Sequence, residues 1–250
     1  MDISLNLKKE IPTVDKIIDE TWKSVNPSLQ DVEENFGNFL LKFDLEATNI
    51  FKRYERKILR RLAEKWIENQ KEEIKEKFRK ILRQPDWKSF IEEASKLFEE
   101  FGILVQNLEK ILGNMRKARG GKTFEKVVAK ALNFIGVSCE IPKGKASKKL
   151  RRIDIVIPSV GVALRTPDKA IFLTCKRTLR ERWKQEVPSA GPNRRVYLIT
   201  IDEELSENKA REINEKGLIA FVRDELKESK FKNFHCIRKL SDLPREVGKL

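Results

Sequence analysis

Two charged residues interrupt or end apolar runs, and their side chains could meet. Asp154 is the only charge inside the apolar run that ends at Pro158, and Lys176 ends the run AIFLTCK. A carboxylate and an ammonium group on neighbouring strands are costly unless something pairs them. A divalent metal and a phosphate would do so, because the carboxylate can bind the cation while the lysine orients or activates an attacking water. An ordinary Asp154–Lys176 salt bridge explains the two residues equally well.

A third candidate, Glu125, lies in a segment rich in glycine and positive charge. The stretch RKARGGKTFEKVV predicts a helix that starts after Gly120-Gly121, with Glu125 one turn inside it. Glycines let the backbone come close to a partner, and Arg119 and Lys122 suit a phosphate group. For Glu125 alone a simpler explanation is favoured, because a glutamate in a first helical turn complements the helix dipole.

The strand that ends at Lys176 continues directly into a cluster of charges. The sequence KRTLRERWKQE predicts a short helix over residues 178–186. One interpretation is a solvated surface helix with Trp183 packed inward. The other is a segment that meets a nucleic-acid duplex at the point where the strand delivers its lysine.

The composition favours a polyanionic partner. The chain has 250 residues, with 53 Lys and Arg against 39 Asp and Glu, a net charge of +14. Such an excess suits nucleic acid, through phosphate contacts and counterion release. Solubility or adaptation to heat would also produce a charge-rich surface.

The sequence lacks the residues that several classes of protein require. The three cysteines are far apart and form no C-x-x-C pair, which argues against zinc and against a disulfide framework. His235 is the only histidine, so a histidine-based nuclease is not expected, and no P-loop for a nucleotide cofactor occurs. No apolar run is long enough to span a membrane, and the N-terminus lacks the apolar core of a signal peptide. The sequence therefore predicts a soluble, cytoplasmic protein.

The elements that must position these residues fall into two regions. Apolar residues at helical spacing predict helices over residues 11–115, including one long helix over 51–82 that ends before Pro85-Asp86. Residues 116–250 predict α/β structure, with a helix closed by Gly136, a basic loop over 142–152 and two strands joined by a turn at 166–168. A strand, a helix, a strand and a late strand around 231–240 follow. We expect a mixed, partly parallel sheet flanked by helices, an α/β (α+β) fold with an N-terminal helical region at 1–115 and a core at 116–250.

The order of these residues resembles that of a known family. Glu on a helix, Asp on a strand and Lys at the end of the next strand is the layout of the PD-(D/E)xK nucleases. RKARGGKTFE and CKRTLRERWKQ look like the two signature stretches of the type II restriction endonucleases that read CCGG, or CC and GG separated by a spacer. The match is direct over about residues 116–190. No motif covers the N-terminal helical half.

The resemblance implies a role for each matching residue. It makes Asp154 the central Mg²⁺ ligand, Lys176 the catalytic lysine and Glu125 a carboxylate near a second metal position. It adds the carbonyl of Cys175 as a further metal ligand. It also implies that three consecutive residues enter the major groove and read G·C pairs, and the chemistry of these types agrees, since arginine matches guanine and glutamate accepts from cytosine. These base-reading residues are Arg180, Glu181 and Arg182.

The sequence departs from the family pattern in two places. The acidic residue expected two positions before the lysine is Thr174, and the glutamate expected on the following helix falls at Ser189. Glu186 lies about one helical turn earlier and is the replacement we expect. Asp168, next to Pro167, needs only the chemistry of a turn.

The resemblance implies a Mg²⁺-dependent endonuclease that cuts double-stranded DNA at a short palindrome and leaves 5′-phosphate ends. Cutting both strands of a palindrome implies a homodimer. The N-terminal helices would serve dimerisation or clasp the duplex. Two alternatives stay open: a structure-specific or repair nuclease of the same fold, and a basic DNA-binding protein without catalysis.

Overall fold

The computed structural model describes residues 10–180, 183–191 and 194–248. The described residues form two compact units, one from residues 10–17 and 48–119 and the other from residues 18–47 and from the described part of the chain after residue 119. The sequence suggested one boundary, at 115/116; the two units divide at 17/18, 47/48 and 119/120, so that residues 18–47 belong with the sheet. Among the described helices none is long and apolar enough to cross a membrane.

The first half of the chain is helical, as predicted. Asp86 caps the last of these helices by accepting a hydrogen bond from the Ser89 N–H at 2.9 Å, which confirms the predicted break at Pro85-Asp86. The helices are α2 (Val14–Val25), α3 (Leu29–Glu34), α4 (Phe36–Asn69), α5 (Lys71–Leu82) and α6 (Trp87–Phe134).

The prediction of a single helix over 51–82 is wrong, because the helix is interrupted at Gln70, between α4 and α5. The break allows Ile74 and Ile81 of α5 to pack with Trp66 of α4 and Leu97 of α6 in one buried cluster. A straight helix would carry α5 away from α6. Several apolar residues of the predicted helix are exposed, namely Leu59, Ile67, Phe78 and Leu82.

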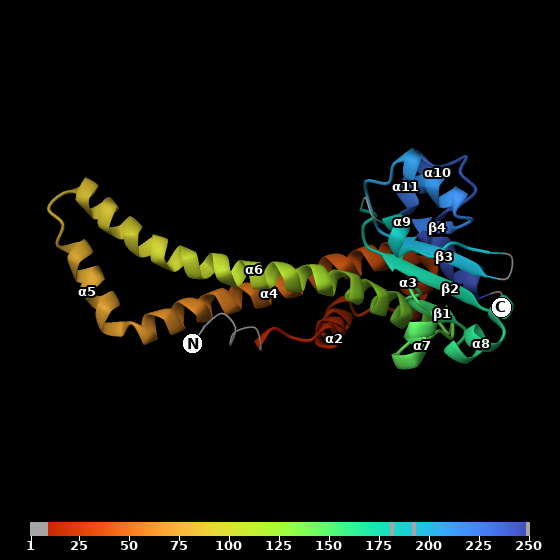
Figure 1. Ribbon diagram of the computed structural model, residues 1–250, viewed down its shortest axis with the longest axis horizontal. Helices are drawn as coiled ribbons and strands as arrows, with labels where there is room; N and C mark the ends of the chain where they lie inside the picture. Colours follow the sequence, from red (N-terminus) through yellow and green to blue (C-terminus); the bar gives the residue numbers. More distant parts are fainter. Residues whose placement is uncertain (1–9, 181–182, 192–193, 249–250) are drawn as a thin grey trace. The chain divides into compact units, whose positions relative to one another are not determined.

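The second half contains a five-stranded sheet in the order β1-β2-β3-β4-β5 (Figure 1). The β1–β2 pair is antiparallel and the other pairs are parallel, so the predicted mixed sheet is confirmed. The strands are β1 (Ile155–Ile157), β2 (Ile171–Lys176), β3 (Arg195–Thr200), β4 (Ile219–Val222) and β5 (Ile237–Lys239).

Short helices connect the strands and cover the sheet. One face of the sheet, including Phe172 and Leu198, packs with Trp183 of α9 and Ile213 of α10 in a single buried cluster. The helices are α7 (Gly144–Lys149), α8 (Val160–Arg165), α9 (Trp183–Glu186), α10 (Glu207–Glu215), α11 (Asp224–Ser229) and α12 (Leu243–Val247), with 3₁₀ turns at Pro167–Lys169 and Leu240–Asp242. The basic loop expected over 142–152 is therefore partly helical, and α8 lies where only a turn was expected.

The helix predicted to start after Gly120-Gly121 does not start there. α6 continues through both glycines and ends at Phe134, where Gly136 adopts the left-handed φ of +84° that closes the helix as predicted. A side chain at Gly121 would meet nothing within 4 Å, and one at Gly120 would meet only the Arg177 guanidinium at 3.8 Å. Neither glycine is thus required by close packing within the described structure, and strong helix formers on both sides keep the helix continuous.

Candidate active site

Asp154 is held in place by the strand that carries the lysine. Its backbone N–H donates to the carbonyl of Leu173 at 2.9 Å, directly before β1 begins. One carboxylate oxygen, Oδ2, accepts hydrogen bonds from the Cys175 N–H at 2.7 Å and from the Thr174 hydroxyl at 3.3 Å. Thr174, the residue that departs from the family pattern, is fully buried and helps to orient the aspartate.

Burial raises the pKa of Asp154, and the Cys175 N–H, the charge of Lys176 and the Thr174 hydroxyl only partly oppose that rise. The negative charge is therefore not fully compensated by its neighbours. The charge of Lys176 lowers this pKa, but by less than burial raises it. The site has capacity for further positive charge.

Glu125 adds a second carboxylate to the same place. Its pKa is raised to about 7, first by burial and then by the negative charge of Asp154, while Lys176, Lys122 and Lys126 oppose the rise. Because Glu125 lies deep inside α6 rather than in a first turn, the helix dipole does not explain it. Two half-buried carboxylates thus lie near one half-buried lysine.

Lys176 is the last residue of β2, at the edge of the sheet where the parallel strands end. It is half-buried, stands in register with Thr200 of β3 and favours ionisation of both carboxylates. Strand geometry therefore delivers the ammonium group to the carboxylates, as the spacing of the apolar run predicts.

The oxygen donors fit a hard divalent cation such as Mg²⁺. Mg²⁺ is commonly bound through one or two carboxylates and keeps several waters, so Asp154 and Glu125 suffice. In the described parts of the chain no cluster of three or more acidic, histidine or cysteine side chains occurs. Burial is the main cause of the raised pKa of Glu125, and a cation here would relieve the repulsion by Asp154 that adds to it.

The thiol of Cys175 is unsuited to bind a hard cation. The side chain is 2% exposed, and burial together with the charges of Asp154 and Glu125 raises the pKa of the thiol well above its usual value. A neutral thiol is a poor ligand for a hard cation.

The segment after Lys176 is an anchored loop, and the helix expected over 178–186 is wrong in its first part. Residues 177–180 are not helical, and α9 begins at Trp183. Arg177 pairs with Asp44 at 2.7 Å, and Arg180 is exposed between the buried side chains of Leu179 and Trp183. Glu181 and Arg182 lie outside the described residues, as does the side chain of Glu186 at the end of α9.

The anchoring residues include two that sequence reasoning missed. Asp202 is 6% exposed, and its Oδ2 accepts from the Leu179 N–H at 2.6 Å. The Lys209 ammonium donates to the Leu179 carbonyl at 2.6 Å. Asp202 follows β3, the strand next to β2, so a carboxylate just past a buried strand was the available signal.

The two residues suggested for phosphate contact differ in their surroundings. Lys122 is exposed on α6. Arg119 lies 5.4 Å from the centre of the Phe51 ring and donates to the carbonyl of Pro12, and burial lowers its pKa. In the described structure Arg119 already has protein partners.

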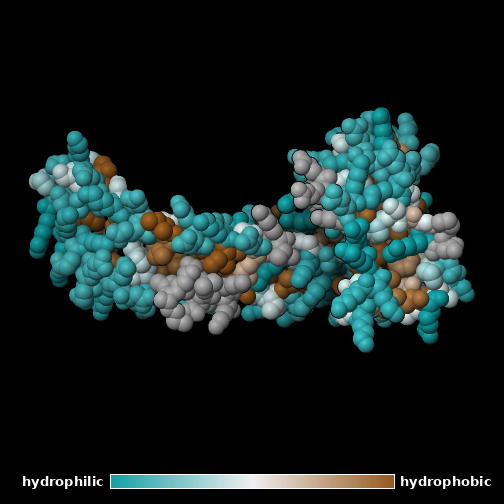
Figure 2. Space-filling view, viewed as in Figure 1, coloured by the Kyte–Doolittle hydropathy of each residue, from teal (hydrophilic) through white to brown (hydrophobic). Residues whose placement is uncertain are grey.

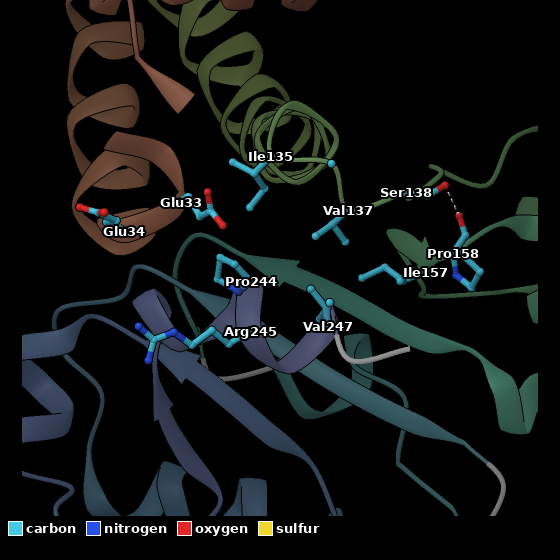
Figure 3. Close-up of a pocket in the computed structure, with 12 residues that line it drawn as sticks. Glu33, Glu34, Ile135, Val137, Ser138, Ile157, Pro158, Pro244, Arg245 and Val247 are labelled. Atoms are coloured by element: carbon cyan, nitrogen blue, oxygen red, sulfur yellow. Dashed lines mark hydrogen bonds between the residues drawn. The ribbon is translucent and has the colours of Figure 1, made fainter. Parts of the chain in front are cut away.

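The sheet unit also contains a hollow of about 730 Å³ (Figure 3). Its lining includes Ile157, Pro158 and Val247 on the apolar side and Glu33 and Arg245 among the charged groups. It lies at the end of β1 opposite to Asp154, and none of its lining residues is a predicted site residue. The hollow is separate from the carboxylate–lysine cluster.

A family model described as EcoRII C terminal matches residues 90–240, which is more than half of the chain. The chain belongs to this family. The match spans all three charged residues of the cluster. It confirms the broad resemblance to type II restriction enzymes on which the site was predicted.

Known proteins agree with this assignment. The type II restriction enzyme SsoII of Shigella sonnei is 28% identical over 145 residues, covering 54% of this chain and 47% of that protein. The chain thus matches about half the length of this curated relative.

Solved structures show the same fold. Ecl18kI, metal-depleted and in complex with uncleaved DNA, is similar with a TM-score of 0.77 and 18% identity, over 98% of this chain and 82% of that one. A PspGI–substrate DNA complex is similar with a TM-score of 0.68 and 22% identity, over 100% of this chain and 96% of that one. The mixed sheet is therefore that of a restriction endonuclease.

Proposed function

We propose that this protein is a Mg²⁺-dependent type II restriction endonuclease that cuts both strands of DNA at a short palindrome containing G·C pairs. One observation carries the proposal: the charges of Asp154 and Lys176 both act on Glu125, so the three side chains lie near one another in a chain of the EcoRII C-terminal family. The solved neighbours, which hold DNA, support a DNA substrate. A chain with net charge +14 suits that substrate. A cytoplasmic location would give the protein access to DNA.

The proposed reaction is hydrolysis of a phosphodiester bond. Water attacks phosphorus, the bond to the 3′ oxygen breaks, and the products carry a 5′-phosphate and a 3′-hydroxyl. Asp154, Glu125 and the carbonyl of Cys175 would hold Mg²⁺, with Glu186 as a further carboxylate. The ion supplies Lewis-acid stabilisation of the charge on the phosphate and the leaving oxygen. Lys176 orients the attacking water and stabilises negative charge next to the cluster.

The exposed loop after β2 would provide the base-reading groups. Arg180, with Glu181 and Arg182, would contact G·C edges in the major groove, in agreement with CCGG-type or interrupted CC…GG sites. Lys122 and Arg119 would contact phosphates. Because Arg119 is already engaged with Phe51 and Pro12, we give Lys122 the larger share of that role.

The protein would act as a homodimer, since a palindrome presents two equivalent bonds. We keep residues 116–250 as the catalytic core and residues 1–115 as the helical region. Of the two roles open to that region, dimerisation is favoured over a DNA clasp. The reason is the surface of the distal segment, which we define as residues 67–103, comprising α5, the start of α6 and the residues beside them.

The distal segment does not share the positive charge of the chain. It holds eight Lys and Arg against nine Asp and Glu, whereas the whole chain has an excess of fourteen positive charges. Four of its lysines, Lys75, Lys77, Lys80 and Lys96, form ion pairs within the segment, for example Lys77 with Glu100 at 2.6 Å and Lys80 with Glu93 at 2.8 Å. A surface that clasps phosphates would instead need unpaired positive charge.

The same segment exposes large apolar side chains beyond its own core (Figure 2). Trp87 is 72% exposed, Phe98 73% and Leu82 74%. Trp87, Ile91 and Phe98 recur at steps of four and seven and so share one side of α6. An apolar stripe with balanced charge around it suits a second copy of the same surface.

Digestion of a sequenced plasmid tests the proposed function. The purified protein is incubated with Mg²⁺ or with EDTA, and the ends are sequenced. We expect discrete Mg²⁺-dependent fragments with 5′-phosphates that share a G·C-containing palindrome. Cutting without a shared sequence would replace the proposal with a structure-specific nuclease. Salt-sensitive binding without cutting would leave a non-catalytic DNA-binding protein.

A further inference from the structure

Leu179 lies between the lysine and the base-reading loop, and charged side chains hold both of its backbone groups. Its N–H donates to Asp202 Oδ2 at 2.6 Å, and its carbonyl accepts from the Lys209 ammonium at 2.6 Å. Lys176 precedes it by three residues and Arg180 follows it directly. The two charged groups come from outside this loop, Asp202 from the end of β3 and Lys209 from α10.

The sheet explains how Asp202 reaches the loop. β2 and β3 are parallel and in register, with Lys176 opposite Thr200. The segments that follow β2 and β3 therefore leave the sheet at the same edge. The Thr200 hydroxyl accepts from the Asp202 N–H at 3.1 Å, and Asp202 Oδ1 accepts from the Glu204 N–H at 3.0 Å. These two hydrogen bonds orient the Asp202 carboxylate toward the Leu179 N–H.

Hydrogen bonding to the Leu179 backbone does not by itself require two charged partners, Asp202 and Lys209. Asp202 is 6% exposed, and the Lys209 ammonium lies 4.0 Å from its Oδ2, so two charges are largely removed from water. A neutral acceptor would satisfy the Leu179 N–H at a lower desolvation cost. Charge-assisted hydrogen bonds are shorter and stronger than neutral ones, and two on one residue hold it firmly.

The Leu179 side chain and the next turn complete the anchor. Leu179 is 2% exposed and Trp183 3%, both in the core cluster of the sheet. The Trp183 N–H donates to the Arg180 carbonyl at 2.9 Å. The backbone of Arg180 is thus held on both sides while its side chain is exposed.

We propose that Asp202 and Lys209 are positioning residues that fix the base-reading loop relative to the catalytic lysine and so determine sequence discrimination. The inference rests on the proposed function. It adds that specificity depends on two residues that contact no base themselves. A shift of the loop by about 1 Å would weaken the arginine contact and misplace the lysine together.

The test compares Asp202→Ala with wild type and with Asp224→Ala. Asp224 is a matched control, because its Oδ1 also accepts a backbone N–H, that of Ser241 at 3.2 Å, in the same unit. For each protein, kcat/KM is measured on the cognate duplex and on duplexes with one altered G·C pair, with the thermal midpoint as a check of folding. We expect Asp202→Ala to reduce discrimination about tenfold and Asp224→Ala to leave it unchanged.

Hydrogen exchange provides a readout that does not depend on activity. The Leu179 amide should exchange faster in Asp202→Ala, and the Ser241 amide should not. Asp202→Asn keeps an oxygen acceptor and should restore part of the discrimination. If Asp202→Ala does not fold, Lys209→Met removes only the donor to the Leu179 carbonyl and is expected to lower discrimination severalfold.

The outcomes separate the two claims. A folded Asp202→Ala protein with wild-type discrimination and unchanged exchange at Leu179 would overturn the positioning role while leaving the nuclease in place. A wild-type protein that cuts no DNA would overturn the proposed function, and the positioning role with it.

Discussion

The Asp154 carboxylate accepts a hydrogen bond at 2.7 Å from the N–H of Cys175, the residue directly before Lys176. The Cys175 N–H, which binds the Asp154 carboxylate, therefore belongs to the residue next to Lys176. The bond also uses one carboxylate oxygen, Oδ2, and the Thr174 hydroxyl uses the same one.

The pKa of Glu125 predicts how metal binding depends on pH. A carboxylate with a pKa of about 7 is mostly protonated at pH 6 and mostly ionised at pH 8, and a cation needs the ionised form. At subsaturating Mg²⁺ we expect cleavage to rise about tenfold over this range. Glu125→Gln should lower cleavage and remove this rise, measured in single-turnover reactions. Glu99→Gln, on the exposed surface of the same helix, should behave as wild type.

The same pKa predicts an effect on stability without metal. The pKa of Glu125 is raised from 4.5 to about 7 in the folded protein, so its stabilising contribution is complete below pH 4.5 and is lost as pH rises through 7. Glu125→Gln should therefore gain thermal stability relative to wild type between pH 5 and pH 8, by a few degrees, about 2–4 °C. A difference that stays constant across this range, in thermal scans with EDTA, would refute the raised pKa.

Arg180 and Lys122 should have different effects on DNA binding. If Arg180 reads a base, Arg180→Ala costs about 1–3 kcal/mol at one G·C position and relaxes specificity there. Lys122→Ala should weaken binding to all sequences alike and reduce the slope of log K against log salt by about 1. Binding titrations at several salt concentrations separate the two. Equal losses on every sequence for Arg180→Ala would indicate a phosphate contact instead.

The distal segment should hold two copies of the chain together. Trp87→Ser with Phe98→Ser removes two exposed aromatic residues, and we expect the dimer dissociation constant to rise at least about tenfold. Sedimentation equilibrium measures the change. Lys88→Ser with Glu99→Ser alters the adjacent positions of the same helix and serves as the control. A variant that stays dimeric but loses DNA affinity would favour the clasp over dimerisation.

Much of the sheet was predictable because strand and turn signals are local. The apolar run before Lys176 predicted the strand, Gly136 predicted the end of one helix, and Pro85-Asp86 predicted a break between two others, as the structure confirms. The three residues of the proposed site follow from their order along the chain and from the family resemblance.

The errors concern features that depend on distant contacts. Gly120-Gly121 suggests a break, yet the helix continues because its neighbours on both sides favour it. The break at Gln70 has no proline or glycine to mark it, and it brings α5 to α6 through packing. Asp202 and Lys209 were missed because their partner, Leu179, is 23 and 30 residues away.

The most direct measurement is single-turnover cleavage of the cognate duplex by wild type, Asp154→Asn and Lys176→Met. Asp168→Asn is the control, because Asp168 lies in the 3₁₀ turn between β1 and β2, at the opposite end of these strands. With Mg²⁺ we expect each site variant to cleave at least about a hundredfold more slowly while still binding the duplex, and the control to cleave as wild type does. Wild-type cleavage by Asp154→Asn would contradict the proposed catalytic site.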